Sequence, residues 1–104
     1  MKSPLARITD RLVRTFDPDR VILFGSRARG TARHDSDIDL LVVMPFSGRR
    51  RDVELQMRLC VHDIGVAKDI VLISPEDLAR YRSIPGTIAR EAARDGREVY
   101  ARSR

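Results

Sequence analysis

The sequence predicts one small α/β (α+β) domain over residues 1–104, with a mixed sheet of three or four strands flanked by helices. A chain of 104 residues has room for a single hydrophobic core. Short, β-branched apolar runs alternate with longer segments in which apolar residues recur every three or four positions. Ser-Pro pairs and single glycines mark where many of these segments begin and end. Together these observations predict the order α-β-β-α-β-α-α-(β).

Each predicted element has a local reason. Ser3-Pro4 and Ser74-Pro75 each place a capping hydroxyl before a proline, which is typical of a helix start. Proline and glycine residues mark the remaining boundaries between predicted elements. The predicted elements are a helix over 4–16, strands over 21–24 and 38–43, a polar loop over 46–51, a helix over 53–64 with Gly65 as its C-cap, a strand over 67–73, a helix over 75–81, a helix from Pro85 to the cap at Gly96, and an edge strand at Val99–Tyr100.

Composition excludes several classes of protein. The apolar runs are far shorter than the roughly 20 residues that span a bilayer, and no signal peptide follows the N-terminus. The single cysteine, Cys60, rules out an internal disulfide and a four-cysteine zinc site. His34 and His62 have no Cys or His cluster around them, so no zinc site is predicted there either. We therefore expect a cytoplasmic protein that does not bind membranes.

The net charge of +5 permits an anionic partner but does not demand one. The polar loop contains three consecutive arginines, Arg49–Arg51, which suit solvent or an acidic partner. A surface that binds single-stranded nucleic acid usually interleaves aromatic residues with basic ones. Aromatic residues make up only 5% of this chain, so direct binding to nucleic acid is not expected.

Two motifs flank the ends of predicted strands. Residues 25–30 read Gly-Ser-Arg-Ala-Arg-Gly directly after the first buried strand, and residues 36–40 read Ser-Asp-Ile-Asp-Leu at the start of the second. Side chains two apart in a strand leave the same face, so Asp37 and Asp39 lie about 6.5 Å apart along it. Two ionised carboxylates this close are either partly protonated or neutralised by a cation. Their hard oxygen atoms suit Mg²⁺.

The topology brings further groups to the same place. If the first two strands neighbour each other after their short connection, they are antiparallel, and a helical crossover lets the third run parallel to the second. Asp69, near the start of the third strand, then reaches the edge where Gly25 and Asp37 lie. Such a cluster suits a metal-bound triphosphate.

The glycine-serine turn supplies the phosphate contacts of this interpretation. Gly25 lets the backbone approach a phosphate, and Ser26 offers a hydroxyl donor. Arg29, and with it Arg27, is placed to meet charge on the triphosphate.

These motifs resemble the signature of the DNA polymerase β-type nucleotidyltransferase superfamily, and the short chain is most similar to its minimal nucleotidyltransferases. The resemblance implies a palm-like sheet and Mg²⁺-dependent transfer of a nucleoside monophosphate from a nucleoside triphosphate, with release of pyrophosphate. It implies phosphate binding by Gly25 and Ser26, and two Mg²⁺ ions held by Asp37 and Asp39. It further implies that Asp69 is the third metal-binding and catalytic carboxylate. Asp69 follows Lys68, where the family has an apolar residue, so Asp63 stays open as an alternative.

The same resemblance implies a partner. Members of this group pair with HEPN-domain toxins, and some silence the toxin by moving AMP from ATP to a tyrosine. We expect an antitoxin that is a protein adenylyltransferase, with the partner or a second subunit completing the substrate site. Two alternatives stay open: a non-catalytic antitoxin that neutralises its partner by contact, and a transferase acting on small aminoglycoside-like alcohols.

Overall fold

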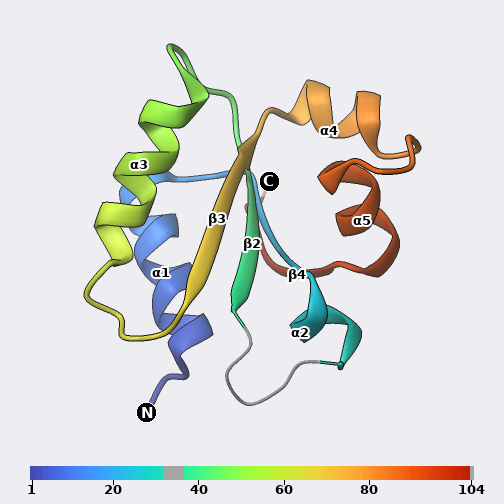
Figure 1. Cartoon of the computed structure of the whole chain (residues 1–104). Coiled ribbons are helices and arrows are strands. Elements are labelled where there is room, and N and C mark those ends of the chain that lie inside the picture. The colour runs from blue at the N-terminus through green and yellow to red at the C-terminus, as the bar shows by residue number, and fades with distance from the viewer. Residues whose placement is uncertain (32–36, 104) are drawn as a thin grey trace.

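The computed structural model describes residues 1–31 and 37–103 (Figure 1). His34 and Ser36, which the sequence analysis named, lie outside the described residues. The elements are α1 (Pro4–Phe16), β1 (Arg20–Phe24), α2 (Ser26–Arg29), β2 (Ile38–Val43), α3 (Arg50–Val61), β3 (Lys68–Ile73), α4 (Pro75–Tyr81), α5 (Ile88–Asp95) and β4 (Arg97–Ala101).

The predicted fold class is confirmed: one mixed sheet has helices on both faces. Its strand order is β3-β2-β1-β4, in which β1 runs antiparallel to β2 and β4, and β2 runs parallel to β3. The parallel pair is joined through α3, as a crossover connection requires. The ends of β2 and β3 that carry the predicted acids therefore lie beside the end of β1 that carries the glycine turn.

The two faces of the sheet are covered unequally. Figure 1 shows α1 and α3 on one face and α4 and α5 on the other. The larger core lies under α1 and α3, whereas the smaller core is built around residues such as Leu41, Leu78 and Ala92. Val71 and Ile73 of β3 pack at the border of the smaller core and are only partly buried. The α4/α5 face is thus incompletely covered over β3.

Helix caps explain most of the boundaries. The side chains of Ser3 and Ser74 accept hydrogen bonds from the backbone at the starts of α1 and α4, as predicted. Pro85 does not begin the last helix, because Thr87 caps α5 by accepting from the Arg90 amide (3.1 Å). Gly65 does not cap α3 either, since that helix ends at Val61.

Two further boundaries differ from the predicted ones. α3 begins at Arg50, inside the predicted polar loop, because Asp52 in its first turn favours a helix start there. The short helix α2 occupies the Gly-Ser-Arg-Ala-Arg-Gly segment, which the pattern predicted only as a turn. Within the part of the chain described here, no helix is long and apolar enough to cross a bilayer.

A buried carboxylate protects the outer edge of the sheet. Glu54 of α3 is only 8% exposed, and its Oε2 accepts a hydrogen bond from the Leu72 amide of edge strand β3 (2.8 Å). That amide faces away from β2, so without Glu54 it would be an unsatisfied donor at an edge open to pairing with another chain.

We expect Glu54→Ala to lower the free energy of unfolding by about 1–3 kcal/mol, because it leaves the Leu72 amide buried without an acceptor. Urea unfolding followed by circular dichroism measures the loss. Glu54→Gln is the matched control, since its carbonyl oxygen can accept the same hydrogen bond, and it should lose clearly less. Equal losses in the two variants would contradict this role.

Candidate active site

Gly25 forms a turn that only glycine adopts readily. It is buried at the end of β1 and has φ +76° and ψ −159°, a region of backbone conformation nearly restricted to glycine. A Cβ atom added there would lie 2.3 Å from Oδ2 of Asp39. The missing side chain therefore makes the space in which the Asp39 carboxylate lies against the backbone of β1.

Asp39 and Asp69 lie side by side on the sheet. They are register partners in the parallel β2–β3 pair, and on its other side Asp39 is the register partner of Phe24 in the antiparallel β1–β2 pair. Partners on adjacent strands point to the same face, with the strands about 4.8 Å apart. This face is the one covered by α4 and α5, because Leu41 and Val71, two residues further along each strand, pack there. Asp37 directly precedes β2 and is exposed.

The carboxylates crowd one another electrostatically. Burial raises the pKa of Asp39, and the charges of Asp69, Asp37 and Glu91 raise it further, while Arg29 opposes them. Two arginines near the cluster are paired with other carboxylates, Arg29 with Glu91 at 2.9 Å and Arg58 with Asp69 at 3.6 Å. The arrangement concentrates negative charge at one point and favours the approach of a cation.

This crowding predicts a dependence of stability on pH. The ordinary value for an aspartate is 3.8, and in the folded protein the pKa of Asp39 lies above it. Between those two values the folded chain holds a proton that the unfolded chain has lost, so stability falls as pH rises through that window. Asp39→Asn removes this penalty.

We therefore expect the melting temperature of Asp39→Asn, minus that of the unaltered protein, to increase as the pH rises from about 3 to about 7 in metal-free buffer. Calorimetry across this range measures the difference. A difference that is constant, or that shrinks as the pH rises, would contradict the crowding of Asp39.

Arg29 of α2 lies close enough to Asp39 for its charge to lower the pKa of that carboxyl. Its Nη1 donates to Oε1 of Glu91 on α5 at 2.9 Å, and both partners are partly exposed. The sequence analysis did not select Glu91, and no local pattern indicates it, because 62 residues separate the pair. Ser26, the first residue of α2, and Arg27 beside it are both partly buried.

Asp69 has a positively charged neighbour that the sequence did not reveal. Nη2 of Arg58 on α3 lies 3.6 Å from Oδ1 of Asp69, and both side chains are about half exposed. Exposed pairs of this kind contribute roughly 0–1 kcal/mol. Arg58 therefore holds the Asp69 carboxylate at the edge of the sheet only loosely.

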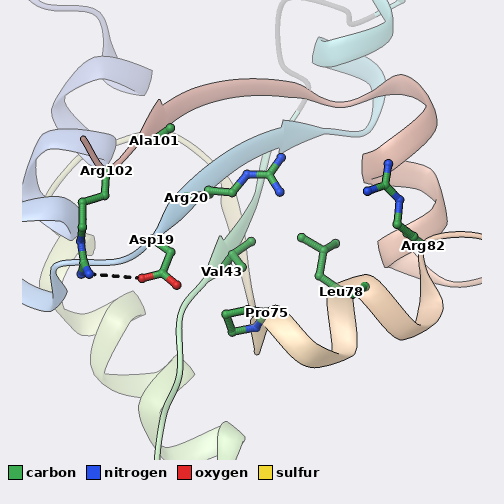
Figure 2. Close-up of a pocket in the computed structure, with 9 residues that line it drawn as sticks. Asp19, Arg20, Val43, Pro75, Leu78, Arg82, Ala101 and Arg102 are labelled. Carbon is green, nitrogen blue, oxygen red and sulfur yellow. Dashed lines mark ion pairs between the residues drawn. The ribbon is translucent and has the colours of Figure 1, made fainter. Parts of the chain in front are cut away.

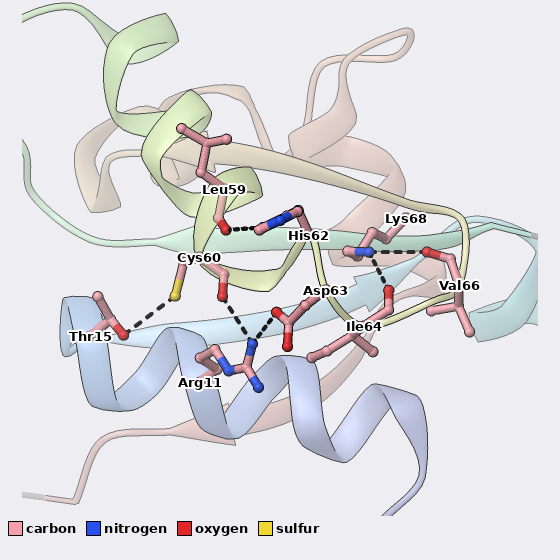
Figure 3. Close-up of polar contacts among 9 residues, drawn as sticks. All are labelled: Arg11, Thr15, Leu59, Cys60, His62, Asp63, Ile64, Val66 and Lys68. Atoms are coloured by element: carbon pink, nitrogen blue, oxygen red, sulfur yellow. Dashed lines mark hydrogen bonds and ion pairs between the residues drawn. The ribbon is translucent and has the colours of Figure 1, made fainter.

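The alternative third carboxylate, Asp63, lies elsewhere. Figure 3 shows it beside Arg11 of α1, with which it forms an ion pair, and the Arg11 hydrogen bond holds the pKa of Asp63 below its usual range. Lys68 does not pair with Asp69, because its Nζ donates to two backbone carbonyls of the loop before β3 (2.7 and 3.1 Å). The geometry favours Asp69 over Asp63.

Comparison with known families agrees with this arrangement. The family model described as polymerase beta, nucleotidyltransferase matches residues 6–104, nearly the whole chain. The chain belongs to this nucleotidyltransferase family.

Relatives of this nucleotidyltransferase include a Methanocaldococcus jannaschii protein named as a protein adenylyltransferase, which is 37% identical over 67 residues. That match covers 57% of this chain and 44% of the relative, so the chain spans less than half the length of that protein.

Solved structures share the fold. A nucleotidyltransferase from Sulfolobus solfataricus superposes with a TM-score of 0.61 at 23% identity, over 95% of this chain and 78% of its own. A mutant of the toxin–antitoxin complex MntA-HpeT superposes with a TM-score of 0.60 at 18% identity, covering 97% and 75%. A toxin–antitoxin structure with AMP-PNP gives 0.55 at 21% identity, covering 92% and 73%.

Carboxylate oxygen atoms gather at this edge of the sheet in the nucleotidyltransferase, but they do not form a closed set of metal ligands among the described residues. Among the described residues, no three His, Cys, Asp or Glu side chains converge closely enough to hold a metal. The crowded oxygen atoms of Asp37, Asp39 and Asp69 are nevertheless ligands that suit Mg²⁺. Which residues hold a metal stays a prediction.

A separate cavity lies at the opposite end of the sheet. Figure 2 shows it between the start of β1, the end of β2 and helix α4, and its volume is about 410 Å³. Arg102 closes one side through an ion pair with Asp19 (3.4 Å). None of the predicted site residues lines this cavity, so it is not part of the candidate active site of the nucleotidyltransferase.

Proposed function

We propose that the protein is a Mg²⁺-dependent adenylyltransferase that moves AMP from ATP to a hydroxyl group and releases pyrophosphate. The observation that carries this proposal is the contact between Gly25 and Asp39: a side chain at residue 25 would displace a carboxylate that lies among two other aspartates. The name of the M. jannaschii relative supports adenylyl transfer, and the neighbour with AMP-PNP supports ATP as the nucleotide.

The chain's own residues have distinct tasks in this reaction. Gly25 and Ser26 bind phosphate oxygens through the backbone and the hydroxyl, and Arg29 meets the charge of the β- and γ-phosphates. Asp37 and Asp39 hold two Mg²⁺ ions, with Asp69 completing the set. When bound, Mg²⁺ lowers the pKa of the attacking hydroxyl and neutralises the leaving group.

The transfer step forms one phosphorus–oxygen bond and breaks another. The acceptor oxygen forms a bond to the α-phosphorus, and the bond from that phosphorus to the bridging oxygen of pyrophosphate breaks. In this proposal Asp69 takes the hydroxyl proton and passes it to solvent. Arg29, oriented by Glu91, remains beside the departing pyrophosphate.

We infer further that the acceptor is a tyrosine of a HEPN-domain toxin, and that the protein acts as the antitoxin in the cytoplasm. Support comes from the structural neighbours in toxin–antitoxin complexes. The second candidate, an antitoxin that neutralises its partner by contact alone, has the same support from the toxin–antitoxin neighbours.

One assay separates the two candidates. The protein is incubated with labelled ATP, Mg²⁺ and the product of the neighbouring gene. Label on the partner that requires Mg²⁺ establishes the enzyme. Neutralisation of the partner without label, by a protein that does not bind Mg²⁺-ATP, would establish the contact mechanism instead.

A further inference from the structure

A groove runs beside α4 at the end of the sheet opposite the candidate active site. It consists of the cavity of about 410 Å³ in Figure 2 and a smaller cavity of about 160 Å³. The two cavities share the lining residues Arg20, Leu78 and Arg82, so they form one elongated depression. We call this depression the α4 groove.

The floor of the α4 groove is aliphatic. Arg20 is the register partner of Val43, which packs in the smaller core, so the groove lies on the face of the sheet that α4 and α5 cover. Val43, Leu78 and Ala92 are buried beneath it. Within the described chain, the residues that line the two cavities include no aromatic side chain. The floor therefore suits aliphatic side chains and offers no platform on which a nucleic-acid base could stack.

Three arginines stand around this floor. Figure 2 shows Arg20 between Arg102 and Arg82 in the cavity wall. Arg102 is held by Asp19 (3.4 Å), and Arg82 is exposed at the end of α4. Arg20 meets Glu98 through its Nε (2.5 Å), so the two Nη groups at the other end of the guanidinium can still donate to a second carboxylate.

The charges that line the α4 groove do not cancel. Three arginines stand against two acids, Asp19 and Glu98, and the whole chain carries +5. The side chains of Arg20 and Glu98 are each 43% exposed, and pairs this exposed contribute little to stability. Arg20 can therefore turn toward an incoming carboxylate at small cost, and Arg82 faces the same space.

The candidate active site does not suit the same ligand. Asp39 and Val43 are four residues apart in β2, so about 13 Å separates the crowded carboxylates from the α4 groove along the strand. The carboxylates repel an acidic group, whereas Arg20 and Arg82 attract it. An acidic ligand is thus directed to one end of this face and kept away from the other.

We propose that the α4 groove is a docking site for an acidic segment of a partner protein, in which carboxylates alternate with aliphatic side chains. In an extended segment these two kinds of side chain leave opposite sides, so the carboxylates reach Arg20 and Arg82 while the aliphatic groups cover the floor. Two connected cavities suit such a segment better than a compact anion. Docking here goes beyond the proposed transfer reaction and does not depend on it.

The test uses the full chain and a fluorescein-labelled synthetic peptide in which glutamates alternate with leucines. A second peptide has glutamines in place of the glutamates, and a single-stranded oligonucleotide of similar length is the third probe. The groove variant is Arg20→Gln with Arg82→Gln. The matched control is Arg7→Gln with Arg14→Gln, which removes the same charge from exposed positions on α1, across the sheet. Fluorescence anisotropy gives each Kd, and thermal unfolding checks that each variant is folded.

We expect the groove variant to raise the Kd for the acidic peptide about tenfold, because two charge-assisted pairs are lost. The control variant should stay within about twofold of the unaltered protein. The glutamine peptide should bind weakly to every variant.

A second variant, Ala79→Glu, adds an acid to the α4 groove and keeps its arginines. Ala79 lines the larger cavity and is exposed on α4, so the change should not disturb the core. The new carboxylate lies three residues before Arg82 on the same helix and competes for its guanidinium. This variant should therefore also bind the acidic peptide more weakly.

Four outcomes would overturn the inference. Equal losses in the groove and control variants would show that the peptide responds only to net charge. Displacement of the peptide by Mg²⁺-ATP would place it at the candidate active site. Tighter binding of the oligonucleotide than of the peptide, lost in the groove variant, would assign the groove to nucleic acid. Failure of the unaltered protein to bind the acidic peptide would remove the docking site.

Discussion

Asp39→Asn is expected to lose adenylyl transfer by more than about a hundredfold while keeping the fold. Loss of a supporting group around a metal already costs roughly 10–100-fold, and Asp39 is the carboxylate on which the proposed site centres. Asparagine has nearly the same shape but no charge, so the contact with Gly25 survives and the attraction for Mg²⁺ does not. Initial rates with labelled ATP measure the loss.

Thermal unfolding provides the second readout for this variant. Mg²⁺ should raise the melting temperature of the unaltered protein, because a ligand that binds only the folded state stabilises it. The melting temperature of Asp39→Asn should not change when Mg²⁺ is added. Asp19→Asn is the control, since Asp19 pairs with Arg102 at the other end of the sheet. Normal adenylyl transfer by the Asp39→Asn variant would contradict the assignment of the metal site to β2.

Gly25→Ala is the second large effect, and we expect it to reduce transfer by a similar factor. The new Cβ would lie 2.3 Å from Oδ2 and 3.2 Å from Cγ of Asp39, so the carboxylate must leave its position. The backbone conformation adds a strain of about 1–3 kcal/mol for any residue with a side chain. Activity and stability should therefore both fall.

Gly48→Ala separates these two causes. Gly48 also has a positive φ, +81°, but no atom lies within 4 Å of the Cβ that alanine would add. This variant should lose stability from strain and keep its transfer activity. If Gly25→Ala retained activity, or if Gly48→Ala lost as much, contact with Asp39 would not be the reason that residue 25 is glycine.

The predictable part of the fold depends on short-range physics. A hydroxyl at Ser3 or Ser74 bonds an amide three residues away, so the cap can be identified from a few letters. The β2 boundaries, Ile38 and Val43, follow from a run of apolar residues between a polar segment and a proline. The neighbouring positions of Gly25 and Asp39 follow from the antiparallel pairing of β1 with β2, in which Phe24 is the register partner of Asp39.

The incorrect boundaries show where local rules compete. Pro85 and Thr87 both suit a helix start, and Thr87 prevails because its hydroxyl reaches the Arg90 amide. Gly65 suits a C-cap, yet the helix ends at Val61, before the loop that leads to β3. Short-range preferences of similar size cannot decide between such neighbours, and packing selects one.

Residue identity and chain order were enough to predict that a glycine turn and paired aspartates meet at one edge of a sheet, because strand alternation and short connections are local constraints. The pairing of Arg29 with Glu91, the position of Arg58 beside Asp69 and the α4 groove came only from the folded structure. These contacts join residues on separate helices and strands, and their distances depend on how whole elements pack. Long-range packing therefore decided which side chains surround the site and which cavities the fold forms, and local chemistry decided where the site lies.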